Sequence, residues 1–286
     1  MPELPEVETA RRNIERGLVG KRIVSVNVGL EKLLRDSPIP DITVLVERTL
    51  QAAERRAKIL VLHFDHDLSL LVHLKLAGQV AVFLPDGTRL VAGHPTPDPT
   101  GPYPHKTTHV TFSFDDGTIA YFSDVRQFGW FRLMPAESVP GAISRFGFGP
   151  EGTGPLDLAV LSAQFLRRSI PVKTFLLDQA FIAGLGNIYV DEVLFRARVH
   201  PATPANAVSA VKRRRILEAV PVVLAAGIAQ GGAKIIHNRA HPVDGFPAVH
   251  GREGEPCFVC GTPIVKTRVG ARGTYYCPKC QKPPRA

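Results

Sequence analysis

Hydrophobic positions divide the first half of the chain into one helix followed by a series of strands. Apolar residues first recur at helical spacing, at Val7, Ala10, Ile14 and Leu18, which predicts a helix with one buried face. Pro5 suits the first turn of this helix and Gly17 suits its end. Glu6 and Glu8 lie near the positive end of the helix dipole, where acidic side chains are favourable.

From residue 20 to about residue 135 the pattern is typical of short strands. Alternating or continuous apolar runs occupy residues 24–28, 58–64, 110–114 and 118–122. Asp86-Gly87 and Asp116-Gly117 are typical of tight turns between antiparallel strands. This spacing predicts an antiparallel sandwich or barrel. The stretch 93–106, rich in Pro and Thr, is expected to form an exposed loop.

Breaker residues cluster between residues 135 and 155 and indicate a linker. Beyond it, helical patterns occupy residues 158–168, 171–179, 187–196 and 206–229. Ala183-Gly184-Leu185-Gly186-Asn187 makes a glycine turn between the second and third of these segments. Such a turn can present backbone amides to phosphate, although a plain connection between helices has the same pattern. Residues 231–254 show no periodicity and are expected to form a mobile loop.

The four cysteines form two close pairs near the end of the chain. Cys257-x2-Cys260 precedes Cys277-x2-Cys280 by sixteen residues, a spacing typical of a four-cysteine zinc ribbon rather than of unligated cysteines. Two short strands, 263–267 and 274–276, are expected between the pairs. One zinc ion held by four protein ligands has no open position for substrate, so its role would be structural.

Composition indicates a partner of negative charge. The chain of 286 residues has a net charge of +9 and a pI of about 9.6, which suits nucleic acid, an acidic protein or a membrane surface. The longest apolar run, 219–229, is too short to span a bilayer. The N-terminus lacks a hydrophobic signal region, and cysteines confined to one metal-like cluster favour a reducing cytosol.

The N-terminus offers a nucleophile. Proline follows Met1, and the initiator methionine is readily removed before a small residue, which leaves Pro2 as a free secondary amine. An α-amino group titrates near pH ~8, so part of it is uncharged at neutral pH and can attack a sugar carbon to give an iminium ion. Glu3 lies next to it and can transfer protons. An ordinary proline-rich N-terminus is the alternative interpretation.

Six blocks, in order along the chain, resemble the formamidopyrimidine-DNA glycosylases of the wider endonuclease VIII superfamily. They lie at residues 2–8, 55–58, 73–78, 124–129, 184–189 and 251–254, the last together with the cysteines and Arg272-Gly273-Thr274. The resemblance implies that Pro2 attacks C1′ of the damaged nucleotide and that β- and δ-elimination then cut the strand. It implies proton transfer by Glu3, support by Glu6, and assistance by Lys58 near the phosphate of the lesion.

The same resemblance assigns the DNA contacts. Asn187 and Arg272 match positions that grip the phosphates around the lesion, and Lys173 is a weaker candidate for the same role. His73 matches a residue near the phosphates. In the family a Met, an Arg and a Phe fill the gap that a flipped base leaves. Those positions are occupied by Leu76, Arg126 and Phe128.

The resemblance also implies the architecture. An α+β multidomain chain is expected, with an N-terminal antiparallel β-sandwich and leading helix (1–135), a linker (136–155), a helix–two-turn–helix domain (156–240), and a lesion loop with a four-cysteine zinc finger (241–286). We expect a monomer that binds one structural Zn²⁺ and damaged double-stranded DNA. A cytoplasmic enzyme is expected, associated with the nucleoid if the source is bacterial.

The lesion loop departs from the family pattern. The family usually has two glycines, threonines and an arginine where this chain has Gly231-Gly232-Ala233-Lys234-Ile235-Ile236-His237-Asn238, and a tyrosine in place of His250. Oxidised purines remain the expected substrates. The alternatives are an endonuclease VIII-like preference for oxidised pyrimidines, a zinc-dependent DNA-binding protein without activity, and an RNA-binding protein of ribosomal type.

Overall fold

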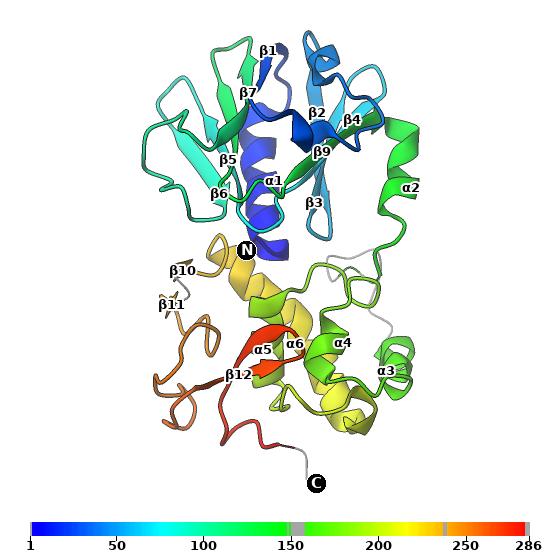
Figure 1. The fold of residues 1–286 in the computed structure, drawn as a ribbon, viewed down its shortest axis with the longest axis vertical. Helices are drawn as coiled ribbons and strands as arrows, with labels where there is room; N and C mark the ends of the chain where they lie inside the picture. Colours follow the sequence, from blue (N-terminus) through cyan, green and yellow to red (C-terminus); the bar gives the residue numbers. More distant parts are fainter. Residues whose placement is uncertain (1, 148, 150–157, 237–238, 284–286) are drawn as a thin grey trace. The chain divides into compact units, whose positions relative to one another are not determined.

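The structure is a computed structural model that describes residues 2–147, 149, 158–236 and 239–283. The chain divides into two compact units, Met1–Arg145 and Phe146–Ala286, which we call unit 1 and unit 2 (Figure 1). Over the described residues, no helix combines the length and the hydropathy that crossing a membrane requires. The finer division into four segments stays a prediction.

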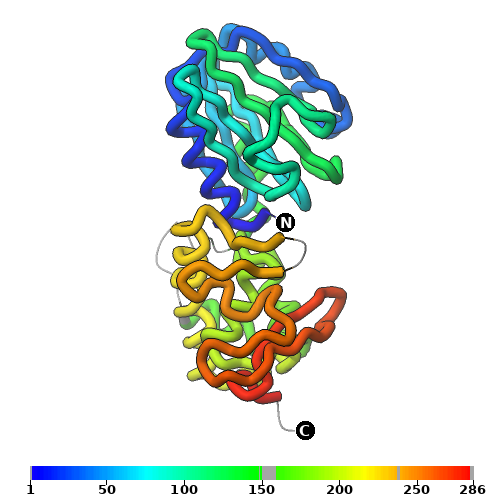
Figure 2. Tube along the Cα trace, turned by 90° about the vertical axis from the view of Figure 1, so that its left-hand side faces the viewer, coloured from blue at the N-terminus to red at the C-terminus, as the bar shows by residue number. Residues whose placement is uncertain are grey.

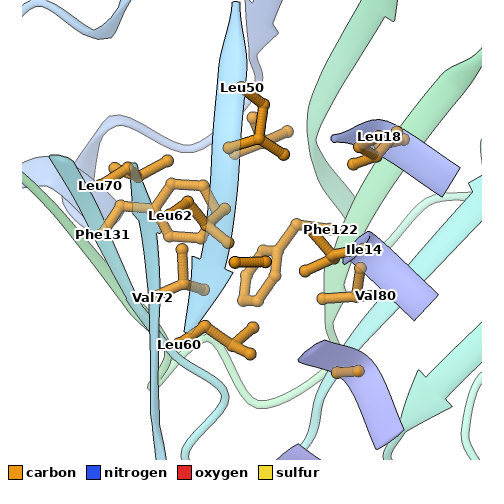
Figure 3. Packing of buried hydrophobic residues seen from close by; sticks show 14 of the residues in the cluster. Ile14, Leu18, Leu50, Leu60, Leu62, Leu70, Val72, Val80, Phe122 and Phe131 are labelled. Atoms are coloured by element: carbon orange, nitrogen blue, oxygen red, sulfur yellow. The ribbon is translucent and has the colours of Figure 1, made fainter. Parts of the chain in front are cut away.

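Unit 1 begins with the predicted helix, α1 (Leu4–Leu18). The apolar positions that predicted it, Val7, Ala10, Ile14 and Leu18, are all buried. α1 contacts β5 and β6 of one sheet as well as β2 and β3 of the other, so its apolar face completes the core between them. Figure 3 shows Ile14 and Leu18 beside side chains from both sheets.

Two antiparallel sheets form the sandwich that the strand pattern predicted. The first has the order β1-β7-β8-β5-β6 and the second β2-β3-β4-β9. The strand bounds are β1 (Ile23–Val28), β2 (Leu50–Arg56), β3 (Ile59–Phe64), β4 (Leu68–His73), β5 (Gly78–Phe83), β6 (Arg89–Gly93), β7 (Thr108–Phe114), β8 (Ile119–Asp124) and β9 (Trp130–Pro135). Gly87 and Gly117 have φ of +85° and +88°, which explains glycine in the two predicted turns. Short 3₁₀ helices, η1 (Glu31–Leu34) and η2 (Ile42–Leu45), lie between β1 and β2.

The segment predicted as a linker is partly helical. A 3₁₀ turn, η3 (Ala136–Ser138), and a short helix, α2 (Val139–Ile143), follow β9 directly. Pro140 lies in the first turn of α2, where the missing N–H of proline costs no hydrogen bond. The density of breaker residues therefore did not exclude helix here. Residues 148 and 150–157 of the predicted linker lie outside the described residues.

Unit 2 contains the helices and the cysteine hairpin. Its helices are α3 (Leu158–Leu166), α4 (Val172–Leu176), α5 (Asn187–Arg196), η4 (Ala205–Ala207) and α6 (Ala210–Ala229), and its strands are β10 (Ile235–Ile236), β11 (Arg239–Ala240), β12 (Val265–Val269) and β13 (Arg272–Tyr276). β13 packs against α5. In Figure 2 the orange-to-red end of the chain lies alongside the green and yellow helices of the same unit.

The longest helix begins later than its apolar pattern predicted. Residues 206–229 were expected to be helical, but α6 begins at Ala210 because Ser209 is extended and its hydroxyl accepts the N–H of Lys212 at 3.4 Å. This is an N-cap that ends the preceding loop. The expected loop 231–254 contains two short strands, β10 and β11, which pair antiparallel. Residues 237 and 238 lie outside the described residues.

Candidate functional site

Pro2, the predicted nucleophile, directly precedes the first turn of α1. Glu3, directly after Pro2, is the N-cap residue of the helix. The backbone N–H of Glu3 donates to Oε2 of Glu6 at 2.8 Å, as part of a capping box between these two residues. That hydrogen bond fixes the peptide group joining Pro2 to the helix. The three predicted residues therefore belong to one rigid turn.

Lys58 lies in the two-residue turn between β2 and β3. Arg56 and Ile59 pair across the strands on either side of it. Ala57, the other turn residue, has a φ of +55°, a left-handed conformation that costs a non-glycine residue about 1–2 kcal/mol. The formamidopyrimidine-DNA glycosylases usually have glycine before this lysine, and glycine adopts a positive φ without strain. Ala57 keeps the same turn, but with the conformational cost given above.

A buried ion pair connects the Lys58 turn to α1. Arg55 donates from Nε to Oε2 of Glu8 at 3.0 Å and from Nη1 to the carbonyl oxygen of Ala57 at 2.9 Å. The side chains of the pair are only 4% and 11% exposed. Burial alone would raise the pKa of Glu8, but hydrogen bonds from Arg11 and Arg55 outweigh burial and lower that pKa. Glu8 therefore stays ionised and holds Lys58 at the end of unit 1 where α1 begins.

Two loops leave neighbouring strands at one end of the sandwich. The β4–β5 loop, residues 74–77, ends at Gly78, and the β8–β9 loop, residues 125–129, starts after Asp124. Gly78 and Asp124 are register partners in β5 and β8. The two loops therefore lie side by side, and we call them the rim.

The rim carries the three residues predicted to fill the gap in the base stack. Phe128 is 51% exposed and Leu76 is 36% exposed, although both side chains are large and apolar. The guanidinium carbon of Arg126 lies 5.5 Å from the centre of the Phe128 ring, within range of a cation–π contact. Apolar side chains held out in water beside a cation are typical of a binding surface.

Asp124 holds the second loop of the rim in shape. Its buried carboxylate accepts the N–H of Arg126 at 3.0 Å through Oδ1 and the N–H of Gly129 at 2.7 Å through Oδ2. The intervening Gln127 has a φ of +54°. These contacts fix the backbone that presents Phe128, so the ring does not have to be ordered by DNA.

His73 holds the first loop of the rim. Its Nδ1 accepts the N–H of Lys75 at 2.9 Å. Burial, with the positive charges of Lys75, Lys58 and Arg145, lowers the pKa of His73 to about 3. The ring is neutral at pH 7, as its acceptor role requires. The contact observed for His73 is therefore with the backbone of its own loop. The phosphate contact that the resemblance implies stays a prediction.

In unit 2 the glycine turn brings Asn187 to the cysteine hairpin. Gly184 has a φ of +97° and its N–H donates to Oε1 of Gln179 at 3.0 Å. Asn187, the first residue of α5, donates from Nδ2 to the carbonyl oxygen of Gly273 at 3.0 Å. Gly273 follows the exposed Arg272 at the tip of the β12–β13 hairpin. The two predicted phosphate ligands therefore lie together.

Lys173 does not take part in this exposed pair. Its side chain is fully buried and Nζ donates to Asp191 Oδ1 at 2.8 Å, to the Gly273 carbonyl at 2.9 Å and to Thr274 Oγ1 at 2.8 Å. An ammonium with three internal partners is not placed to contact a phosphate on the surface. This corrects the prediction for Lys173, whose role in the structure is to position the backbone next to Arg272.

Two acidic residues of α5 attach the lesion loop and the hairpin to the helix. Asp191 Oδ2 is hydrogen-bonded to His250 Nδ1 at 2.7 Å and accepts the N–H of Tyr275 at 3.1 Å. Glu192 accepts three consecutive backbone N–H groups, those of residues 248–250, at 2.7 to 2.9 Å. His250, which replaces the tyrosine usual in the family, therefore attaches its loop to α5 through Asp191. His237 and Asn238 lie outside the described residues.

The four cysteines converge as the spacing predicted. Their sulfur atoms all lie within 4.8 Å of one another, and none forms a disulfide. The distances Cys257–Cys280, Cys260–Cys277 and Cys260–Cys280 are 4.0, 3.5 and 3.6 Å. Four sulfurs each ~2.3 Å from one tetrahedral ion would lie about 3.8 Å apart. The residues therefore fit one structural zinc ion.

Comparison with known proteins gives matches along the chain. Three family models match: the formamidopyrimidine-DNA glycosylase N-terminal domain at residues 1–131, the formamidopyrimidine-DNA glycosylase H2TH domain at 148–238, and the zinc finger found in FPG and IleRS at 254–283. The formamidopyrimidine-DNA glycosylase of Streptococcus thermophilus is 38% identical over 99% of this chain and 100% of its own.

Solved structures agree with this match. Lactococcus lactis Fpg in complex with DNA containing an abasic site has a TM-score of 0.85 and 30% identity, covering 99% of this chain and 100% of its own. The same enzyme with DNA containing N7-benzyl-Fapy-dG matches with the same score, identity and coverage.

Proposed function

The chain belongs to the formamidopyrimidine-DNA glycosylase family, and from this premise we propose that Pro2 is the nucleophile that removes oxidised purines from duplex DNA. The protein is a DNA glycosylase of base excision repair with abasic-site lyase activity. The observation that carries the assignment of residues is the fixed N-terminal turn, which the Glu8–Arg55 pair connects to the Lys58 turn. We further propose that the enzyme acts as a monomer in the cytoplasm, close to the nucleoid.

The chemistry follows from an amine held on a helix. The nitrogen of Pro2 attacks C1′ and the glycosidic bond breaks, so the base leaves as the sugar ring opens to an iminium ion. Loss of a proton from C2′ then expels the 3′ phosphate, and a second proton loss expels the 5′ phosphate. Glu3 directly follows Pro2 in the chain and serves as the group that moves these protons. Lys58 supplies a cation for the phosphate next to the lesion.

A panel of duplexes tests the preference for purines. Initial excision rates should be measured on DNA with 8-oxoguanine, with a formamidopyrimidine and with an oxidised pyrimidine, against an abasic duplex as a control for the lyase step. Faster release of the two purine lesions supports the proposal. Faster release of the pyrimidine would favour the endonuclease VIII-like alternative, and would fit the departure of residues 231–238 from the family pattern.

Phe128→Ala should lower excision of a paired lesion on the order of tenfold or more. Flipping a base costs a few kcal/mol and leaves a gap in the stack, and a half-exposed ring on a fixed loop can fill that gap. The same variant should lose much less activity on a lesion in single-stranded DNA, where no gap forms. A loss of unfolding free energy above roughly 3 kcal/mol would instead identify Phe128 as a core residue.

Arg272→Ala should weaken binding to damaged and undamaged duplex equally, and should lower the slope of log Kd against log salt by about one unit. The reason is that an exposed guanidinium at a hairpin tip releases one counterion when it binds a phosphate. Asn187→Ala is the matched neutral control and should change affinity with little change in slope. A change only in the ranking of lesions by Arg272→Ala would contradict the phosphate role.

A further inference from the structure

We propose that unit 2 has a second binding site, for an acidic peptide segment that carries an apolar side chain. The site combines two adjoining hollows that share Arg198, Val259 and Cys280 among their lining residues. We call the turn between Cys257 and Cys260 a zinc knuckle. Both hollows border this knuckle through Val259, so we call the site the knuckle groove. It goes beyond the glycosylase reaction and does not depend on it.

The first hollow is mixed, with an apolar part. Its volume is about 360 Å³, and its apolar lining includes Phe195, Val222, Phe246 and Val259; its charged lining residues are Glu192, Arg196, Arg198 and Asp244. Val222 on α6 and Val259 in the knuckle are 45% and 60% exposed. The buried Glu192 in the lining already accepts three N–H groups from residues 248–250. The hollow therefore suits one apolar side chain, such as a leucine or a phenylalanine.

The second hollow is cationic. Its volume is about 400 Å³, and its charged lining residues are Arg198, Lys212, Lys279 and Lys282, with no acidic residue among them. Among the residues that the structure describes, none of these four forms an ion pair with a carboxylate. A zinc ion with four thiolates has a net charge of about −2, which leaves an excess of positive charge. This hollow is suited to carboxylates.

The knuckle groove is distant from the elements that grip DNA. Asn187 begins α5, whereas Arg196 and Arg198 lie at its other end, roughly 14 Å along a helix of this length. The cysteine pairs likewise lie away from the tip at Arg272: Cys257 and Cys260 precede β12, and Cys277 and Cys280 follow β13. A nucleic acid backbone would use the cations but not the apolar part of the first hollow, whereas an acidic peptide with an apolar anchor uses both. The ligand of the knuckle groove is therefore a segment of a protein rather than a nucleic acid.

A labelled peptide tests the proposal. The probe has five aspartates followed by a leucine and a phenylalanine, and its binding to the zinc-loaded full-length protein is followed by fluorescence anisotropy. Saturable binding is expected, and replacing either the aspartates or the two apolar residues with serine should weaken it. An unlabelled undamaged duplex should not displace the probe. Displacement by duplex, or no binding of the probe, would overturn the proposal.

Charge-reversal variants locate the binding. Arg198→Glu combined with Lys212→Glu should weaken probe binding by roughly tenfold, as expected for exposed charge pairs turned repulsive. Lys32→Glu combined with Arg35→Glu, exposed residues of unit 1, makes the same change in net charge and should leave binding within about twofold.

Val222→Asp tests the apolar part of the first hollow, away from the cysteines. It should weaken probe binding while zinc content and lesion excision stay unchanged. The probe could also bind the Arg198→Glu/Lys212→Glu variant, the Val222→Asp variant and the unit 1 control with equal affinity. That result would place the probe elsewhere and refute the knuckle groove.

Discussion

Enzyme that retains Met1 should form no borohydride-stabilised adduct with DNA containing an abasic site, and removing Met1 from the same sample should restore the adduct. A retained methionine places the nitrogen of Pro2 in a peptide bond, where it has no nucleophilic lone pair. The expected loss is on the order of a thousandfold or more, because the proposed nucleophile is then missing from the reaction. Trapping is measured as a cross-linked band, with N-terminal mass confirming the processing state.

The control for this experiment is treatment with a methionine aminopeptidase. It changes only Met1, so recovery of the adduct excludes damage to the rest of the protein. Pro2→Gly, correctly processed, should retain partial trapping because glycine still offers a primary amine. Undiminished trapping by enzyme with Met1 in place would assign the nucleophile to another amine, with Lys58 the first to test.

Cys277→Ser should remove zinc and most DNA affinity while the sandwich of unit 1 stays folded. The hairpin and its knuckles have a small apolar cluster of their own, and structural zinc in finger peptides supplies roughly 10–16 kcal/mol of apparent binding energy. Unit 1 has a separate core, so it should unfold at its usual temperature. Metal analysis, duplex binding and thermal unfolding measure the three effects.

Thr267→Ser is the matched control for this variant. It makes a similar conservative change at an exposed position on β12, away from the sulfur atoms, and should keep one zinc ion per chain. Full zinc content and normal duplex binding in Cys277→Ser would refute the structural role of the metal.

Periodicity and spacing were enough for the elements whose signal is local. The first helix, the strands with their glycine turns and the convergence of the cysteines follow from apolar spacing, from the need for positive φ and from tetrahedral coordination. The helical residues 136–143 were not predicted, because proline in a first turn resembles a breaker in the sequence. The late start of α6 depends on one hydroxyl cap, which the apolar pattern does not register.

The residues missed or misjudged at the site are those whose partners are distant in sequence. Glu8 and Arg55 are 47 residues apart, and only the contact of α1 with β2 reveals them as a pair. Asp124 looked like the start of a motif, whereas its carboxylate shapes the whole loop. Lys173 has the positive charge that a phosphate ligand needs. Its burial is set by Thr274, 101 residues later, so no local pattern distinguishes a structural ammonium from an exposed one.

The buried ammonium of Lys173 also makes zinc and DNA mutual effectors. It holds the carbonyl of Gly273, the residue between Arg272 and Thr274, so the hairpin beside the four cysteines is also the hairpin that we propose binds phosphate. Whatever factor zinc contributes to duplex affinity, the duplex must contribute to zinc affinity, because the coupling free energy is reciprocal. Repair complexes should therefore resist chelation better than free enzyme, so that the protein keeps its metal most securely while it is working.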